Sequence, residues 1–231
     1  METFLPPEGI TSLIWKGDTV LLIMHTSSSG EDCIRFFVGV GKEIFECMEL
    51  IVIPQLLLIA GTGRNTGKTT FACQILRKFS QVKSIYSVKI TPHFHKNIQS
   101  GKVILETNNL YIAEETDSST TKDSSLMLGS GAQKSFFVMA TDENLMEAFQ
   151  KIIQMIPSGS FIVCESGGLR HHVVPGLFFM MNKTEVEKIK PDAEKLKLLA
   201  DRVITFDGEK TDFELNSIEI NDNRWKIKDM L

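Results

Sequence analysis

The glycine-rich stretch GTGRNTGKTT at residues 61–70 constrains the fold of this chain more than any other feature of its sequence. It directly follows the apolar run at residues 55–60, which is too short to cross a membrane. After it, the apolar residues Phe71, Ile75 and Phe79 recur at helical spacing. A strand, a glycine-rich turn, Lys-Thr-Thr and a helix occur in this order in phosphate-binding loops, or P-loops. We therefore expect this stretch to bind a nucleoside triphosphate.

The residue types of the loop suit phosphate and magnesium. Backbone N–H groups in the loop and at the start of the helix favour anions, because they donate hydrogen bonds at the positive end of the helix dipole. Lys68 is expected to reach the β- and γ-phosphates, and the Thr69 hydroxyl to bind Mg²⁺. An ordinary strand-to-helix turn is the alternative, because Gly-Lys-Thr-Thr alone recurs by chance. The residues expected to contact the nucleotide are Gly61, Gly63, Arg64, Asn65, Thr66, Gly67, Lys68, Thr69 and Thr70.

The spacing of the glycines is unusual for such a loop. Five residues lie between Gly61 and Gly67, whereas the usual motif has four. Thr62 stands where the usual first glycine would be. The loop is therefore of a longer kind.

The composition is that of an ordinary globular protein. The chain has 231 residues, of which 42% are hydrophobic and 23% charged, which fits one α/β domain with an appendage. A net charge of −4 gives no reason to expect nucleic acid or a membrane surface as a partner. Residues 61–103, however, contain eight Lys or Arg and no Asp or Glu. This bias favours a polyanionic ligand near the loop, although solvated helix and turn positions explain part of it.

The four cysteines favour a reducing compartment. They form no CxxC pair, and Cys73 and Cys164 lie in apolar periodic segments. No basic-then-apolar leader opens the sequence. We therefore expect a cytoplasmic protein without a membrane span.

The chain divides into a short N-terminal part and a larger α/β part. Residues 12–15, 19–25 and 33–40 are β-like runs between turn residues, so we expect residues 1–47 to form a small β extension of open function. In residues 48–231, strand and helix patterns alternate, which predicts a P-loop domain with a doubly wound, mainly parallel sheet. The expected later strands are residues 82–90, 135–140, 160–165, 176–181 and 202–206, and the expected later helices are residues 141–156, capped by Thr141, and residues 192–201.

A long insertion, residues 91–134, separates the second and third core strands. Residues 102–115 predict a hairpin in which Asn108 and Asn109 take the left-handed turn conformation. The polar residues 116–125 predict a mobile loop. Such a long excursion usually carries function. The tail from residue 207 is expected to add an edge strand.

Three residues at predicted strand ends are further candidates, because ligands of open parallel sheets bind there. Glu165 is expected to bind Mg²⁺ or orient an attacking group, with a turn carboxylate as the alternative. Lys89 is expected to neutralise a phosphate or a substrate anion, with a solvated lysine as the alternative. Asn182 begins Asn-Lys-Thr-Glu, which resembles the Asn-Lys-x-Asp element by which many GTPases bind guanine. Because glutamate replaces aspartate, GTP and ATP both remain open, and so does a plain turn.

Several motifs occur in the order found in a known family. They are residues 67–70, Lys89 with His93 and His95, residues 122–124 leading to Gly131 and Ala132, and Glu165. In this combination the chain resembles the B-type accessory proteins of molybdopterin-guanine dinucleotide biosynthesis, which belong to the P-loop class that also contains dethiobiotin synthetase. The resemblance covers roughly residues 50–206, judged by motif order. Thr91 and Pro92 are inserted relative to the family pattern, and Ser166 follows Glu165 where a glycine is usual.

The resemblance implies a Mg²⁺-dependent protein that binds and slowly hydrolyses GTP or ATP and supports guanylylation of molybdopterin or a related step. Lys68 and Glu165 would be the catalytic residues, Thr69 and Glu165 the metal ligands, and a cofactor-biosynthesis enzyme the partner, with a homodimer left open. One alternative is an ATP-dependent ligase resembling dethiobiotin synthetase, in which Lys89 and residues 122–125 hold an acid that becomes phosphorylated. Another is a non-catalytic, nucleotide-dependent binding module.

Overall fold

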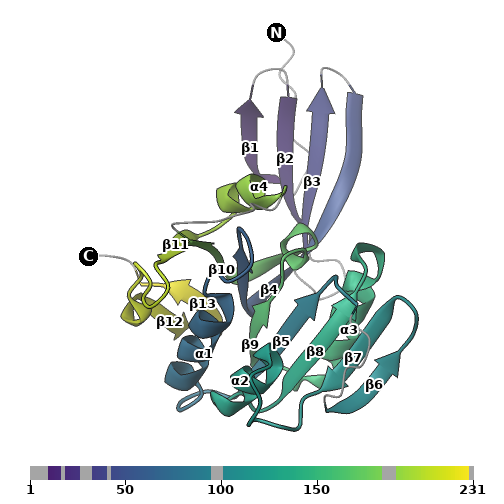
Figure 1. The fold of residues 1–231 in the computed structure, drawn as a ribbon. Coiled ribbons are helices and arrows are strands. Elements are labelled where there is room, and N and C mark those ends of the chain that lie inside the picture. The colour runs from purple at the N-terminus through teal and green to yellow at the C-terminus, as the bar shows by residue number, and fades with distance from the viewer. Residues whose placement is uncertain are drawn as a thin grey trace. The chain divides into compact units, whose positions relative to one another are not determined.

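The computed structural model describes residues 10–16, 19–26, 33–40, 43–94, 101–183 and 191–228, with side chains from residue 50 onward (Figure 1). The chain divides into two compact units. One contains residues 1–53 and 171–174, and the other contains residues 54–170 and 175–231. None of the described helices combines the length and the apolar character that crossing a membrane needs.

The first unit is an antiparallel meander. Its strands are β1 (Ile10–Lys16), β2 (Thr19–Thr26), β3 (Cys33–Val40) and the first part of β4 (Glu43–Gly61). Each strand pairs antiparallel with the next along the chain. Branched and aromatic residues, which favour strands, are frequent in all of them. The three β-like runs predicted before residue 41 are therefore confirmed as strands.

The second unit contains a mainly parallel sheet with the strand order β11-β10-β4-β9-β5-β8-β7-β6. β4 pairs parallel with β9, β9 with β5, β5 with β8, and β10 with β11. The hairpin of β6 and β7 continues the sheet antiparallel beside β8. The bounds are β5 (Ile85–Thr91), β6 (Lys102–Glu106), β7 (Leu110–Glu114), β8 (Ser135–Ala140), β9 (Phe161–Glu165), β10 (Val173–Lys183) and β11 (Arg202–Phe206). The α/β class and the mainly parallel sheet are confirmed.

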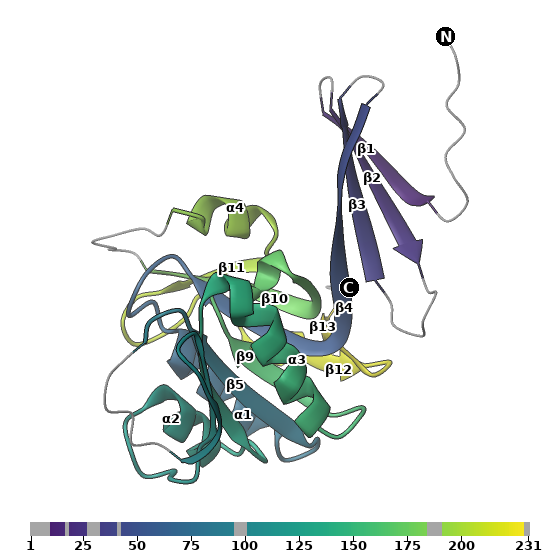
Figure 2. The same cartoon turned by 90° about the vertical axis from the view of Figure 1, so that its right-hand side faces the viewer.

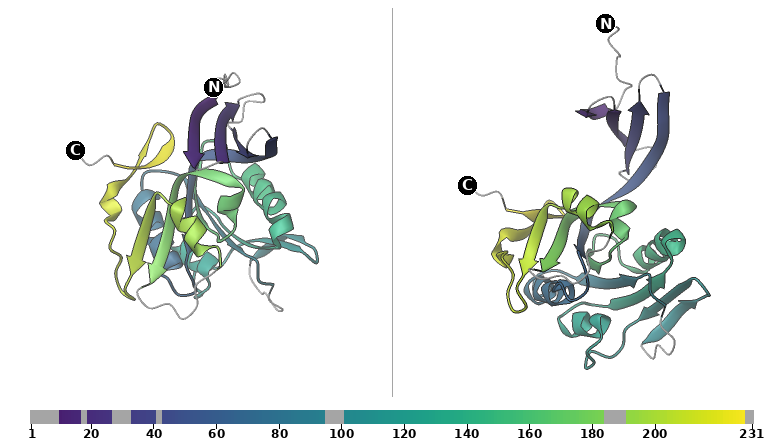
Figure 3. Two further views of the ribbon diagram at one scale, coloured as in Figure 1. Left: turned by 90° about the horizontal axis from the view of Figure 1, so that it is seen from above. Right: turned by 45° about the horizontal axis from the view of Figure 1, so that its top comes forward.

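Helices lie on both faces of this sheet (Figure 2, Figure 3). α1 and α2 cover one face, and α3 covers the other. Alternate residues of a strand point to the same face of the sheet. On β4, Leu57 and Ile59 point to the face that α1 covers, where they pack in one core cluster with Phe71 and Ile75 of α1. The bounds are α1 (Lys68–Phe79), α2 (Asp123–Gly129), α3 (Leu145–Met155) and α4 (Ala193–Leu198), with 3₁₀ turns η1 (Asp142–Asn144), η2 (Leu169–His171) and η3 (Leu215–Ser217).

Two helix predictions need correction. Thr141 is the N-cap residue, as predicted, but of the 3₁₀ turn η1 that leads directly into α3. Its hydroxyl makes no capping hydrogen bond and instead donates to Asn144 Oδ1 at 2.8 Å. The helix predicted at residues 192–201 is the shorter α4, in which Asp192 is the N-cap residue.

The prediction that the C-terminal tail adds an edge strand also needs correction. As far as residue 228, where its described part ends, the tail adds no edge strand to the main sheet but forms a separate hairpin of β12 (Ile218–Asn221) and β13 (Arg224–Ile227). Asp222 and Asn223 have positive φ angles, which a two-residue hairpin turn requires. The hairpin places Trp225 in the core, where its ring is fully buried and edge-on to Phe79 and Phe161. Burial of this side chain favours the separate hairpin over an exposed edge strand.

The hairpin predicted in the insertion is confirmed, but its turn differs from the prediction. Neither Asn108 nor Asn109 has a positive φ angle. Instead, the Thr107 N–H donates to the Leu110 carbonyl at 2.8 Å and closes the turn without left-handed residues. The polar stretch after the hairpin contains the start of α2, a helix that the sequence pattern did not predict.

Candidate functional site

The glycine-rich loop connects β4 to the N-terminus of α1, and its conformation explains both flanking glycines. Gly67 is the N-cap of α1, with φ 80° and ψ 8°, a left-handed conformation that favours glycine. A Cβ at Gly67 would lie 2.6 Å from Cγ of Phe206, the last residue of β11. A Cβ at Gly61 would lie 2.5 Å from the Thr66 hydroxyl oxygen. Side chains at either position would disrupt the loop.

The loop presents hydrogen-bond donors that the described part of the chain does not use. The backbone N–H groups of Gly63, Arg64, Asn65 and Gly67 donate to no acceptor among the described residues. The ammonium group of Lys68 folds back over the loop and donates to the Gly63 carbonyl at 2.9 Å. It also donates to the Thr66 hydroxyl at 3.3 Å. The loop thus combines amides without an acceptor among the described residues, the start of a helix and one lysine, which are the groups that bind anions.

A second group of side chains adjoins the loop through Thr69, and we call Thr69, Lys89, Asp123 and Glu165 the carboxylate cluster. The Thr69 hydroxyl oxygen lies 2.9 Å from Asp123 Oδ1 and 2.8 Å from Glu165 Oε2. The Lys89 ammonium group forms ion pairs with Glu165 and, at 2.7 Å, with Asp123 Oδ2. The Glu165 side chain is 3% exposed and that of Lys89 15%, whereas that of Asp123 is 40% exposed. The cluster is therefore closed at its base and open on the Asp123 side.

The sheet topology positions three members of the cluster. Glu165 ends β9, which lies between β4 and β5. Its Cα is in register with Ile59 on β4 and with Lys89 on β5, near the carboxyl ends of all three strands. Because α1 starts just beyond the end of β4, Thr69 reaches the same place. Asp123 comes from outside the sheet, as the first residue of α2.

The electrostatics of the cluster favour its charged form. Burial acts to lower the pKa of Lys89, but the Glu165 and Asp123 carboxylates outweigh this effect and raise the pKa above its ordinary value. Burial acts to raise the pKa of Asp123, but Lys89 outweighs it, so that the pKa lies below its ordinary value. By formal charge, two carboxylates and one ammonium group give the cluster a net charge of −1.

This oxygen-rich set fits Mg²⁺. Two carboxylate oxygens approach one hydroxyl oxygen, whose single proton can be donated to only one of them at a time. Mg²⁺ usually binds one or two protein carboxylates and takes its other ligands from phosphates and water. Within the described ranges, no group of three or more His, Cys, Asp or Glu could hold a metal. Thr69, Asp123 and Glu165 could hold Mg²⁺ only if water or phosphate supplied its remaining ligands.

The other predicted residues lie around this centre. Arg64 and Asn65 are exposed on the loop, and Thr70 is exposed in the first turn of α1. Asn182, near the end of β10, accepts a hydrogen bond from the Thr62 hydroxyl through Oδ1 at 3.3 Å. Its side chain thus contacts the start of the loop, while Glu185 of the predicted base-binding element lies outside the described residues.

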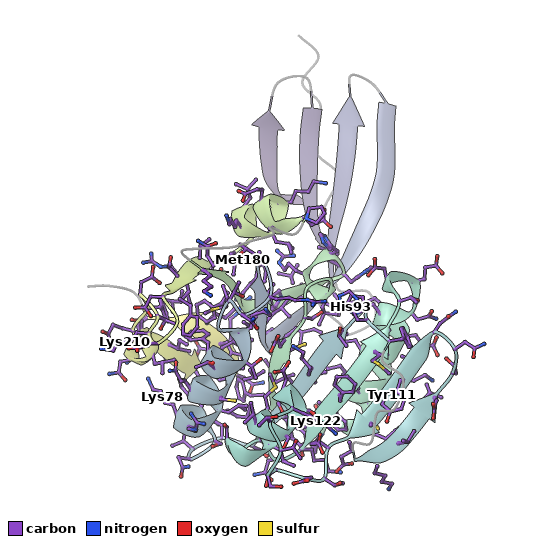
Figure 4. All side chains as sticks on the ribbon, in the orientation of Figure 1. Lys78, His93, Tyr111, Lys122, Met180 and Lys210 are labelled. Atoms are coloured by element: carbon purple, nitrogen blue, oxygen red, sulfur yellow. The ribbon has the colours of Figure 1, made fainter. Side chains whose placement is uncertain are left out.

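Histidines are not part of this centre in the described structure. His93 follows β5 and is exposed (Figure 4). His95 lies outside the described residues. The contacts of Thr69 and Lys89 go instead to two carboxylates.

Sequence reasoning missed two contributors to the site. Asp123 lies in the segment that the ligase alternative placed with Lys89, but the sequence did not single it out or join it to Thr69 and Glu165. Phe206 ends a strand that was predicted correctly, yet its contact with Gly67 depends on how β11 lies in the unit. Both contacts arise from the three-dimensional arrangement. The signals for Asp123 were the motif order and the ligase alternative, which placed residues 122–125 near Lys89.

Comparison with known proteins gives no assignment. The chain matches no protein-family model, no curated protein and no solved structure. The interpretation of the site therefore depends on its geometry and on the motifs of the sequence.

Proposed function

We propose that the protein binds a nucleoside triphosphate with Mg²⁺ and hydrolyses it slowly. The observation that carries this proposal is the junction at Thr69. One residue there joins a loop whose amides have no acceptor among the described residues to two carboxylates, the buried Glu165 and the partly exposed Asp123. Phosphate groups need the first feature and their magnesium counter-ion needs the second.

Each part of the junction would have its own task. The loop amides and the Lys68 ammonium group would hold the phosphates, since they are the positive groups of the loop. Thr69, Asp123 and Glu165 would hold Mg²⁺, which when bound supplies charge neutralisation between neighbouring phosphates. Catalysis would then consist mainly of positioning and charge stabilisation.

The main role of Lys89 would be to neutralise part of the negative charge of the carboxylates, and its contact with a ligand would be secondary. The Lys89 ammonium group is already paired with Glu165 and Asp123, so its positive charge offsets part of the repulsion between the two carboxylates. It also places a positive charge at the carboxyl end of β5, where a second substrate would approach the phosphates.

Substitution of Lys68 tests the proposal. Lys68→Ala should abolish binding of ATP and GTP in the presence of Mg²⁺, measured by titration calorimetry, and should abolish phosphate release. Lys195→Ala is the matched control, because Lys195 is an exposed lysine of α4 with 80% side-chain exposure. If Lys68→Ala bound both nucleotides as tightly as the unchanged protein, the proposed function would be wrong.

The biological role of this activity is also a proposal. Motif order supports an accessory step in the guanylylation of molybdopterin or a related cofactor, carried out with a partner enzyme. A second candidate, an ATP-dependent ligase, is favoured by one contact: Lys89 reaches Asp123 of the segment expected to hold an acid substrate. Formation of phosphorylated or ligated product in proportion to ATP consumed, in a panel of small carboxylic acids, would support the ligase.

A further inference from the structure

A buried glutamate outside the carboxylate cluster holds the segment that delivers Asp123. Glu115 follows β7 and is only 4% exposed. Its Oε1 accepts hydrogen bonds from the N–H groups of Thr116 and Asp117, both at 3.1 Å. Its Oε2 accepts one from the Ser124 hydroxyl at 2.8 Å. A carboxylate with this many donors is a strong anchor.

The anchor acts one residue away from the cluster. Ser124 is itself buried, with 1% exposure, and directly follows Asp123 in the first turn of α2. The next residue, Ser125, is also buried and links the helix to the preceding loop. Its hydroxyl donates to the Asp117 carbonyl and accepts a hydrogen bond from the Thr120 N–H. The first turn of α2 is thus tied back to the loop by two consecutive serines.

The anchor is also fixed to the sheet. The backbone N–H of Glu115 donates to the Ser135 carbonyl of β8 at 2.8 Å. α2 is only seven residues long, so its own hydrogen bonds hold it weakly. Met127 of α2 packs in the core, while the contacts from β8 through Glu115 to Ser124 hold the first turn of α2, where Asp123 lies beside Thr69 and Lys89. The position of Lys122, beside the start of α2, can be followed in Figure 4.

We propose that Glu115 is a positioning residue for the metal site and acts through Ser124 on Asp123. The inference rests on the proposed function in that it assigns the Thr69, Asp123 and Glu165 oxygens to a divalent cation. Partners that orient metal ligands typically change metal affinity 10- to 100-fold when they are removed. Glu115→Ala should therefore weaken binding of the metal without removing any ligand.

Binding of Mn²⁺ to the nucleotide-free full-length protein, followed by the electron paramagnetic resonance signal of free Mn²⁺, measures this effect directly. Glu115→Ala should weaken binding by about 10-fold, and Ser124→Ala should give a smaller loss in the same direction. Glu115→Gln keeps an acceptor for the two backbone amides and should lie between Glu115→Ala and the unchanged protein. Glu114→Gln is the matched control for Glu115→Gln. Glu114 is the adjacent residue, and its carboxylate pairs with the partly exposed Lys134 and not with Ser124. This control should leave Mn²⁺ affinity unchanged.

A double substitution separates positioning from general loss of stability. In an Asp123→Asn background, Glu115→Ala should cause no further loss of Mn²⁺ affinity, because the ligand that it positions is already impaired. If the two losses instead multiply, or if Glu115→Ala and Ser124→Ala bind Mn²⁺ like the unchanged protein, the inference is wrong. Nucleotide binding by Lys68→Ala is a separate measurement, so the proposed function can fail while the Mn²⁺ titrations still decide the role of Glu115.

Discussion

The glycine-rich loop and the carboxylate cluster meet at Thr69, but they are built in different ways. The loop is one continuous stretch, and the groups that we propose to bind phosphate are its backbone amides, whose conformation depends on Gly61 and Gly67. The cluster gathers side chains from β5, β9, α1 and α2, and its proposed role in metal binding depends on their charges. The loop should therefore be sensitive to shape and the cluster to charge.

Gly67→Ala tests the shape of the loop and should have the largest effect. A left-handed conformation costs a side chain about 1–2 kcal/mol, and a contact of 2.6 Å with the Phe206 ring adds about 1–3 kcal/mol. We expect a loss of about 4 kcal/mol in the free energy of unfolding, measured with urea.

Gly159→Ala is a matched control for the shape of the loop. Gly159 has a φ angle of 77°, similar to that of Gly67, but a Cβ there would have no neighbour within 4 Å. Only the cost of the left-handed conformation, about 1–2 kcal/mol, should appear. Equal losses for the two alanine variants would show that packing against Phe206 does not constrain the loop.

Lys89→Met tests the charge of the cluster and should have the next largest effect. It leaves the Glu165 and Asp123 carboxylates close together without their cation. Removing one partner of a buried ion pair costs about 3–5 kcal/mol, and because Asp123 is partly exposed we expect the lower end, about 3 kcal/mol. Unlike Gly67→Ala, this variant should bind Mn²⁺ more tightly than the unchanged protein, since the site then carries more negative charge.

The partly exposed ion pair of Lys134 and Glu114 is the control for Lys89. Lys134→Met should cost about 1 kcal/mol or less and leave Mn²⁺ affinity unchanged, because exposed ion pairs contribute little. A Lys89→Met protein with unchanged Mn²⁺ affinity would contradict the view that the cluster works by charge.

The difference between a continuous loop and a cluster of side chains from distant segments also explains which parts of the structure could be predicted from the sequence. β8 and β11 lie at the predicted residues, and α1 follows the loop as expected, because short apolar runs and helical spacing are local signals. The loop was predictable for the same reason, since all its residues are consecutive. Lys89 and Glu165 could be placed at strand ends, although only the strand order β4-β9-β5 makes them neighbours.

The elements that the sequence did not predict depend on distant partners. Trp225 is buried against Phe79 and Phe161, and no local pattern in the tail indicates those contacts. α2 begins with Asp123, Ser124 and Ser125, which alone are typical of a loop. The buried carboxylate of Glu115 accepts from one of these serines and stabilises a helix start that local propensity does not favour.

The smallest predicted effect is the pH dependence of the stability that Asp123 contributes. It tests whether Asp123 stabilises the protein through its charge, as expected for the cluster. Lys89 holds the pKa of Asp123 below its ordinary value of 3.8, despite the opposing effect of burial. Ionised Asp123 therefore stabilises the folded state above the unfolded-state pKa, and this contribution is lost as the pH falls through the lower, folded-state pKa. Urea unfolding should show the unchanged protein to be more stable than Asp123→Asn near pH 7, with the difference shrinking steadily below about pH 4. A difference that stays constant down to pH 2 would mean that Asp123 contributes through hydrogen bonds and packing, as the loop does, and not through its charge.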